Sequence, residues 1–407
     1  MNPESRGRHR LAVISALGVF EILSWGSSFY LLAVLAGPIA AETGWPLVWI
    51  IGGLSLGLLV AGLISPRVGA RIGRRGGRPV LAFSAAIMAA GLALLGLAPA
   101  LPVFVGAWVL LGLGMGTGLY DPAFATLGRL YGAEARPAIT TLTLWGGFAS
   151  TVSWPLSAFL IQHVGWRGTC FAYAGLQLAV SLPLVLLVVP AAPPRAVPPG
   201  SEPGAGPGTD PGADPGADPG ADPVLAPAER RAFRLFAGVL TLGGTVMTLL
   251  SVHLLALLQA RGVALAAAVS FGALIGPAQV AARVVEMAGR GRHHPLWTLT
   301  AAMSLVALGL GMLAAGLPAV ALALVLYGAG NGIYSIARGT VPLALFGPAR
   351  YAPLVGRLAR PGLVAQALAP TLGAVVLAQG GPDALFGLLA VLALANVGLV
   401  GLHWRAR

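Results

Sequence analysis

The sequence predicts an all-α integral membrane protein with twelve transmembrane helices in two parallel six-helix repeats. Hydrophobic residues make up 57% of the 407 residues and charged residues only 9%, whereas soluble domains are about one-quarter charged. Long apolar stretches recur along the whole chain, and the second half repeats patterns of the first. An α-helix needs roughly 20 apolar residues to cross a ~30 Å hydrocarbon core, and these stretches reach that length.

Twelve stretches satisfy the length requirement, and almost no charge lies inside them. The predicted spans are 11–36, 47–66, 79–98, 102–124, 137–161, 168–190, 232–258, 263–288, 295–316, 318–340, 352–379 and 384–404. The first is too long for the ~7–15-residue apolar core of a signal peptide. We therefore expect it to remain as the first span.

A segment rich in proline, glycine and aspartate, 191–231, separates the first six spans from the last six. Its apolar content is too low to form a core, so we predict a disordered cytoplasmic linker. It joins an N-terminal bundle, 1–190, to a C-terminal bundle, 232–407. Its aspartates lack the glycine spacing and final glutamate of a calcium loop, and no metal site is predicted.

Charge between the spans predicts the topology. All 25 basic residues are arginine, and outside the spans only Arg167 and Arg261 fall on the side opposite the termini. The positive-inside rule then places both termini in the cytoplasm, and we expect a multi-pass protein of the inner membrane of a bacterium. The net charge of +12 is explained by this topology, so nucleic acid is not an expected partner. The single cysteine, Cys170, excludes an intramolecular disulfide.

The two halves share sequence patterns at matching places. Residues 114–120 read G-M-G-T-G-L-Y and residues 328–334 read G-A-G-N-G-I-Y. Because each half has an even number of spans, the repeats insert with the same orientation, an arrangement typical of transporters. A nucleotide-binding loop is the alternative for these glycines, but no strand precedes them. Close packing of helices in lipid explains them better.

In the loop between the second and third spans, residues 69–78 read G-A-R-I-G-R-R-G-G-R. This segment resembles a signature of the major facilitator superfamily, G-x-x-x-D-R-x-G-R-R. The positions that fit are Gly69, Arg74, Gly76 and Arg78. Gly73 replaces the aspartate and Gly77 replaces an arginine. The resemblance extends over all twelve spans and implies the fold of that family. It also implies that this loop latches the two halves when the cavity faces outward.

Glu21 is the first candidate functional residue. It lies ten residues into the first span, or ~15 Å from the edge, near the centre of the membrane. An ionisable group there costs about 2.5–3.5 kcal/mol or more, so we predict that Glu21 carries the coupling proton. Trp25 and Ser28 follow at i+4 and i+7 and share its face. The alternative is a protonated glutamate that only hydrogen-bonds a neighbouring helix.

Other charged residues within the spans suggest gating. We expect Asp121 to lie near the cytoplasmic face and to pair with Arg74 or Arg78. Glu286 has Arg283 one turn earlier, an i,i+3 pair that can neutralise itself at an inner helix end. Two interpretations of Arg338 are open: its planar guanidinium binds an anionic substrate, or it extends to the interface.

Polar and aromatic side chains within the spans predict a substrate cavity between the repeats. The candidates are Trp25, Ser28, Tyr120, Ser150, Trp154, Thr245, Gln279, Asn331, Tyr334, Arg338 and Gln366. Each could instead form a hydrogen bond between helices.

We therefore predict a secondary active transporter, not an enzyme, that moves a small molecule by alternating access and is coupled to protons. It needs no cofactor or metal, resides in the lipid bilayer and works as a monomer. Residues 120–124 and 335–340 loosely resemble segments of bacterial efflux permeases for xenobiotics and arsenicals, which favours efflux. One alternative is proton-coupled uptake of a small organic anion at Arg338, and another is a non-transporting membrane sensor. The absence of lysine excludes an ATP-binding loop of the G-x-x-x-x-G-K type.

Overall fold

A computed structural model describes residues 3–191, 225–289 and 292–405, and within these ranges the secondary structure is helical, without strands. Eight helical stretches of the described chain are long and apolar enough to cross a membrane. Large apolar side chains such as Val48, Val285 and Leu187 lie exposed on the surface, as contact with lipid requires. The prediction of an all-helical membrane protein is confirmed.

In residues 3–191 the first half forms nine α-helices and two short turns. They are α1 (Pro3–Gly26), α2 (Leu31–Thr43), α3 (Leu47–Arg75), α4 (Arg78–Leu97), α5 (Leu101–Gly118), α6 (Tyr120–Tyr131), η1 (Gly132–Glu134), α7 (Ala135–Gly147), α8 (Ala149–Leu176), η2 (Gln177–Ser181, a π-helical turn) and α9 (Leu182–Val188). The first predicted span is divided, because the chain turns between Gly26 and Leu31. Ser28 Oγ donates to the Ser24 carbonyl oxygen at 2.6 Å there, a bond that bends helices.

The described part of the second half forms five helices. They are α10 (Pro227–Ala260), α11 (Leu265–Ala273), α12 (Ile275–Ala288), α13 (Pro295–Ala314) and α14 (Val320–Arg405). The long helix α14 leaves helical geometry at Gly347 and Gly381, each with φ 71°. Glycine adopts this conformation readily, and the proline that follows each one suits the first turn of a new helix. These breaks fall between the predicted spans 318–340, 352–379 and 384–404.

The segment predicted as a linker is shorter at its C-terminal end than expected. α10 begins at Pro227, so residues 227–231 are helical. Proline suits the first helical turn, and the Glu229 carboxylate accepts a hydrogen bond from the Ala226 backbone N–H at 3.0 Å. Arg350 of α14 also binds Glu229, at 2.6 and 3.0 Å. Most of the predicted linker, 192–224, lies outside the described residues.

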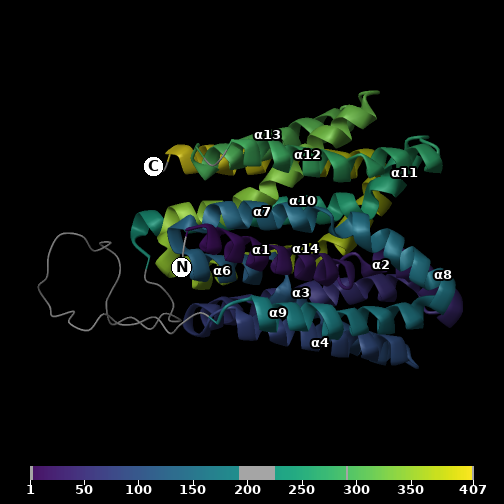
Figure 1. The fold of residues 1–407 in the computed structure, drawn as a ribbon. Helices are drawn as coiled ribbons and strands as arrows, with labels where there is room; N and C mark the ends of the chain where they lie inside the picture. Colours follow the sequence, from purple (N-terminus) through teal and green to yellow (C-terminus); the bar gives the residue numbers. More distant parts are fainter. Residues whose placement is uncertain (1–2, 192–224, 290–291, 406–407) are drawn as a thin grey trace, which may run out of the picture.

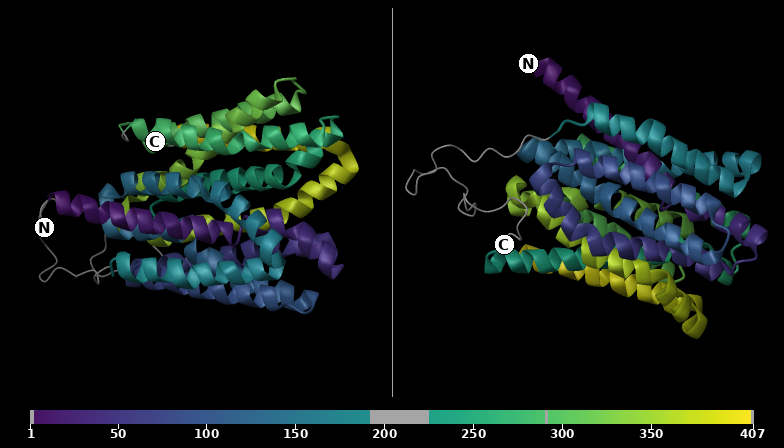
Figure 2. Two further views of the ribbon diagram at one scale, coloured as in Figure 1. Left: turned by 45° about the vertical axis from the view of Figure 1, so that its right-hand side comes forward. Right: turned by 90° about the horizontal axis from the view of Figure 1, so that it is seen from below.

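The helices run side by side along one common direction (Figures 1 and 2). α1 begins and α14 ends at the same end of the bundle, which we call the terminal face (Figure 1). α11–α13 lie on one side of the molecule and α3, α4 and α9 on the other, with α7 and α10 between them (Figure 1). The last part of α14 lies beside α12 and α13 (Figure 1).

The two halves pack closely near the terminal face, where α3, α6 and α7 meet α12 and α14. One apolar core there combines Phe124 of the first half with Tyr351 and Val355 of α14. Gly69, near the end of α3, touches α14 directly: a Cβ at this position would lie 2.5 Å from the Ala352 carbonyl oxygen. The position therefore requires glycine, because backbone occupies the space of a side chain.

Candidate functional site

An ion pair joins the two halves inside the bundle. Arg338 Nε of α14 donates to Asp121 Oδ1 of α6 at 3.0 Å, and Arg338 Nη2 donates to Asp121 Oδ2. The two side chains are only 19% and 13% exposed. This is the planar two-bond geometry by which arginine binds a carboxylate.

The predicted partners of Asp121 are wrong. Asp121 does not pair with Arg74 or Arg78, and Arg78 instead donates to the Leu186 carbonyl oxygen of α9. The chain is extended at Leu119, and α6 starts at Tyr120. α6 then continues for ten residues beyond Asp121, or ~15 Å. Asp121 therefore lies in the first turn of α6 and faces α14. The Arg338 guanidinium is bound by a carboxylate of the protein and does not extend to the interface.

Glu21 lies fully buried beside this ion pair. Its Oε2 accepts a hydrogen bond from Trp25 Nε1 at 2.8 Å, as the i,i+4 spacing allows. Its Oε1 has no partner among the described residues. Asp121 and Arg338 are both close enough to act electrostatically on Glu21. The Glu21 carboxyl is therefore held at one oxygen by its own helix, while the other oxygen has no described hydrogen-bond partner.

An aromatic cluster covers the ion pair on the side of the first half. It consists of Trp25, Phe29, Tyr30, Tyr120, Phe124 and Trp154, whose ring centroids are 5.1–6.1 Å apart in successive contacts. Trp25 is central, with Phe29, Tyr30 and Tyr120 around it. Trp154 is 47% exposed at the edge. Sequence analysis missed Phe29, Tyr30 and Phe124; the aromatic pair directly after the Glu21 stripe was the available signal.

The cavity between the halves is small. Its volume is about 40 Å³, and its walls include Trp25, Tyr120, Asp121, Arg338 and Gln366, all of which the sequence indicated as site candidates. Ligand pockets usually have volumes of about 300–1,000 Å³, whereas one water needs about 10–15 Å³. This conformation therefore has room for water-sized molecules, and a substrate requires the halves to separate.

Arg283 of α12 is a second buried guanidinium, only 5% exposed. Its Nε donates to the Gly332 carbonyl oxygen of α14 at 3.1 Å, while its Nη1 lies against Gly147 of α7 and has no hydrogen-bond partner in the described part of the chain. Tyr30 and Tyr120 of the aromatic cluster lie within its electrostatic reach.

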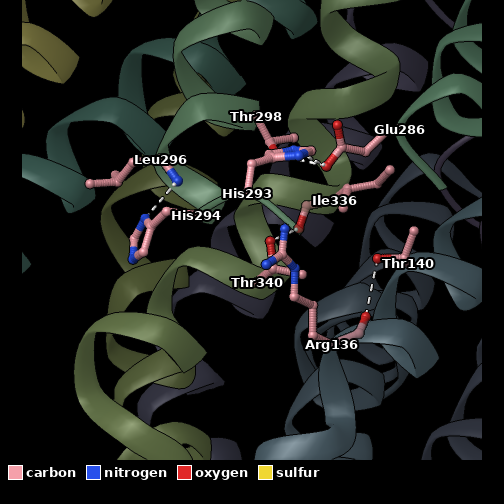
Figure 3. Close-up of polar contacts among 9 residues, drawn as sticks. All are labelled: Arg136, Thr140, Glu286, His293, His294, Leu296, Thr298, Ile336 and Thr340. Atoms are coloured by element: carbon pink, nitrogen blue, oxygen red, sulfur yellow. Dashed lines mark hydrogen bonds and ion pairs between the residues drawn. The ribbon is translucent and has the colours of Figure 1, made fainter. Parts of the chain in front are cut away.

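The predicted pair of Arg283 and Glu286 does not form. Glu286 Oε1 accepts a hydrogen bond from Thr298 of α13 at 2.7 Å and lies 3.1 Å from His293 Nε2 (Figure 3). One helical turn separates the two side chains, but they point to different neighbours: Arg283 to α7 and α14, and Glu286 to α13. Arg136 extends toward Ile336 and Thr340 of α14 in the same region (Figure 3).

The following candidates do not line the cavity at the ion pair, although Tyr334 acts electrostatically on Asp121 and Arg338. Asn331 and Tyr334 line a separate space of about 10 Å³. Thr245 donates to the Thr241 carbonyl oxygen of its own helix at 2.8 Å. Ser150 of α8 and Gln279 of α12 are half-buried.

The residues of the predicted signature loop have several different surroundings. Gly69 packs on α14, and Gly76 ends α3 with φ 78°. Arg74 lines an open groove beside α3 together with Arg71 and Arg360.

Comparisons with known proteins agree with this architecture. Residues 14–293 match the family model of the Major Facilitator Superfamily. The fold is similar to the crystal structure of the human organic anion transporter MFSD10 (TETRAN), with a TM-score of 0.74 and 19% sequence identity. The match covers 98% of this chain and 100% of the other. At this identity the likeness concerns the fold alone. No curated protein sequence matches the chain.

Proposed function

Because the chain belongs to the Major Facilitator Superfamily, we propose that it is a proton-coupled secondary transporter that works by alternating access. Membership indicates a multi-pass membrane transporter of small molecules rather than an enzyme. Proton coupling is supported by the position of Glu21, which is fully buried beside the Asp121–Arg338 pair that joins the halves.

The coupling follows from the cost of buried charge. A charge without a partner in a dry site is expensive, and so is the removal of one member of a buried pair. A proton gained or lost at Glu21 changes the field at Asp121 and Arg338 and thereby the strength of the link between the halves. Glu21 would be reached from one compartment in one conformation and from the other compartment after the halves rock.

The proposed topology has twelve spans in two six-helix bundles, with both termini in the cytoplasm of a bacterium. The breaks at Gly165, Gly347 and Gly381 support this number, because each lies between two predicted spans. The arginine distribution supports the orientation. The transporter is proposed to be a monomer.

Of the two substrate classes that the sequence leaves open, a small organic anion has specific structural support. Two guanidiniums lie at the interface between the halves, Arg283 buried and Arg338 with 19% of its side chain exposed. The similar protein MFSD10 is described as an organic anion transporter. Efflux of a xenobiotic or an arsenical is supported only by the short segments 120–124 and 335–340.

Proteoliposomes that contain a trapped pH dye test the coupling. We expect at least one of benzenesulfonate, arsenite and ethidium to move protons with the wild type. Glu21→Gln should abolish proton movement and keep substrate exchange, because the amide cannot release a proton. Unchanged proton movement with Glu21→Gln would remove Glu21 from the mechanism. Substrate flux that is independent of the pH gradient in the wild type would refute proton coupling itself.

A further inference from the structure

We infer that Arg283 binds the charged group of an organic monoanion, and that Glu21 takes up one proton for each anion bound. This inference rests on the proposed transport function and names its substrate class and stoichiometry. The observation behind it is a buried guanidinium between the two halves that has no carboxylate partner among the described residues.

Arg283 keeps its positive charge, because arginine is not deprotonated in proteins. One of its nitrogens binds the Gly332 carbonyl oxygen, while Nη1 has no partner among the residues described. The nearest acid on its own helix, Glu286, is bound to Thr298 and His293 instead. An uncompensated charge inside a membrane protein is costly. An anionic ligand would remove this cost by supplying the missing charge.

Arg338 is less suited to this role. Both oxygens of Asp121 already bind its guanidinium. A substrate carboxylate would have to displace Asp121 and leave that carboxylate buried without a partner. The sequence suggested Arg338 as the anion site, whereas the structure favours Arg283.

The surroundings of Arg283 indicate the rest of the ligand. Tyr30 and Tyr120 carry hydroxyl groups that can donate to an anion, and their rings continue into the aromatic cluster with Trp25 and Trp154. Gly147 makes room for the guanidinium, since a Cβ there would collide with Nη1. The site fits an anion with an apolar or aromatic body.

The proton stoichiometry follows from the charges around Tyr120, on which Glu21, Arg283 and Arg338 all act electrostatically. The carboxyl of Glu21 faces Trp25 of its own helix, Asp121 of α6 and Arg338 of α14. Five other helices pack on α1, and three of them, α5, α9 and η2, carry no ionisable residue. The ionisable residue of α7 is Arg136. Those of α8 are His163, Arg167, Cys170 and Tyr173.

Around Arg283, the charged and titratable groups are Tyr30 and Tyr120 across the interface, Arg338 and Tyr334 on α14, Arg136 on α7 and Glu286 on α12. α11 has no ionisable residue. Arg136 and Glu286 interact with each other, away from the ion pair.

When Glu21 is ionised, it and Asp121 balance the two guanidiniums of Arg283 and Arg338. When Glu21 is protonated, one positive charge remains. Binding of a monoanion to Arg283 therefore restores neutrality only if Glu21 also holds a proton. The two events favour each other, which is the requirement for cotransport of a proton and an anion.

Titration calorimetry on the purified full-length protein tests both parts. Benzoate is the anionic probe, and benzamide is an uncharged molecule of the same shape. We expect wild-type protein to bind benzoate at least about 10-fold more tightly than benzamide, since hydrogen bonds to charged groups contribute about 1.5–3 kcal/mol. Arg283→Gln should lower benzoate affinity to that of benzamide, and Arg283→Lys should fall between them. The matched control Arg71→Gln removes an exposed arginine and should bind like the wild type.

The same titrations in buffers of different ionisation enthalpy report proton uptake between pH 5 and 9. Uptake by the wild type should approach one proton per benzoate toward the upper end of this range, and Glu21→Gln should take up none. These readouts on the wild type and Arg283→Lys remain decisive if Arg283→Gln does not fold.

Equal affinity for benzoate and benzamide, or normal benzoate binding by Arg283→Gln, would overturn the anion site. The same holds if the wild type binds neither benzoate nor benzenesulfonate. Proton uptake that is absent at every pH, or unchanged in Glu21→Gln, would overturn the stoichiometry. Proton-driven flux of arsenite or ethidium in the liposome experiment would still support the proposed function in each case.

Discussion

The ion pair between Asp121 and Arg338 should be the strongest single link between the halves. Its side chains are 13% and 19% exposed, so solvent screens it little. Removal of one partner from a buried pair typically costs about 3–5 kcal/mol, because the other charge is left without compensation. We expect Asp121→Asn and Arg338→Gln each to lower the free energy of unfolding by about this amount.

The double variant Asp121→Asn/Arg338→Gln should lose much less free energy of unfolding than the sum of the losses in the two single variants. Both charges are then absent, and replacement of a whole buried pair is often nearly neutral. The coupling energy from a double-mutant cycle should therefore exceed about 1.5 kcal/mol. Unfolding in SDS, followed by tryptophan fluorescence, measures the four free energies.

Two outcomes of this cycle would refute the reasoning. The first is that each single variant costs less than about 1 kcal/mol, as exposed pairs do. The second is that the two effects add in the double variant, which would mean that the residues do not interact. The exposed-arginine variant Arg71→Gln serves as a control and should stay within about 0.5 kcal/mol of the wild type.

Two further predictions concern the terminal face. Gly69→Val should prevent the close approach of α3 to Ala352 and favour a conformation that is open at this face. Cysteines introduced at this face should then be labelled faster. Unchanged labelling would contradict the packing argument. Glu229→Gln should destabilise the start of α10 by about 1 kcal/mol, because it loses the Arg350 pair and weakens the helix cap. Hydrogen exchange at the first turn of α10 should accelerate, and equal exchange in the two proteins would count against the cap.

The positions of the helices could be predicted from sequence because the signals are local. The length of each apolar stretch reflects the thickness of the bilayer, and a glycine followed by proline marks the breaks at Gly347 and Gly381. Glu21 and Trp25 could be placed together for the same reason, since four residues along a helix bring two side chains to one face.

The partners of the charged side chains were decided by the tertiary structure alone. Asp121 and Arg338 lie 217 residues apart, and their contact depends on the depth at which α5 ends and α6 begins. Arg283 and Glu286 are neighbours in sequence, yet the rotation of α12 directs one toward the other half and the other toward α13. Helical periodicity fixes which residues share a face, but only the packing of the helices decides which face meets which partner.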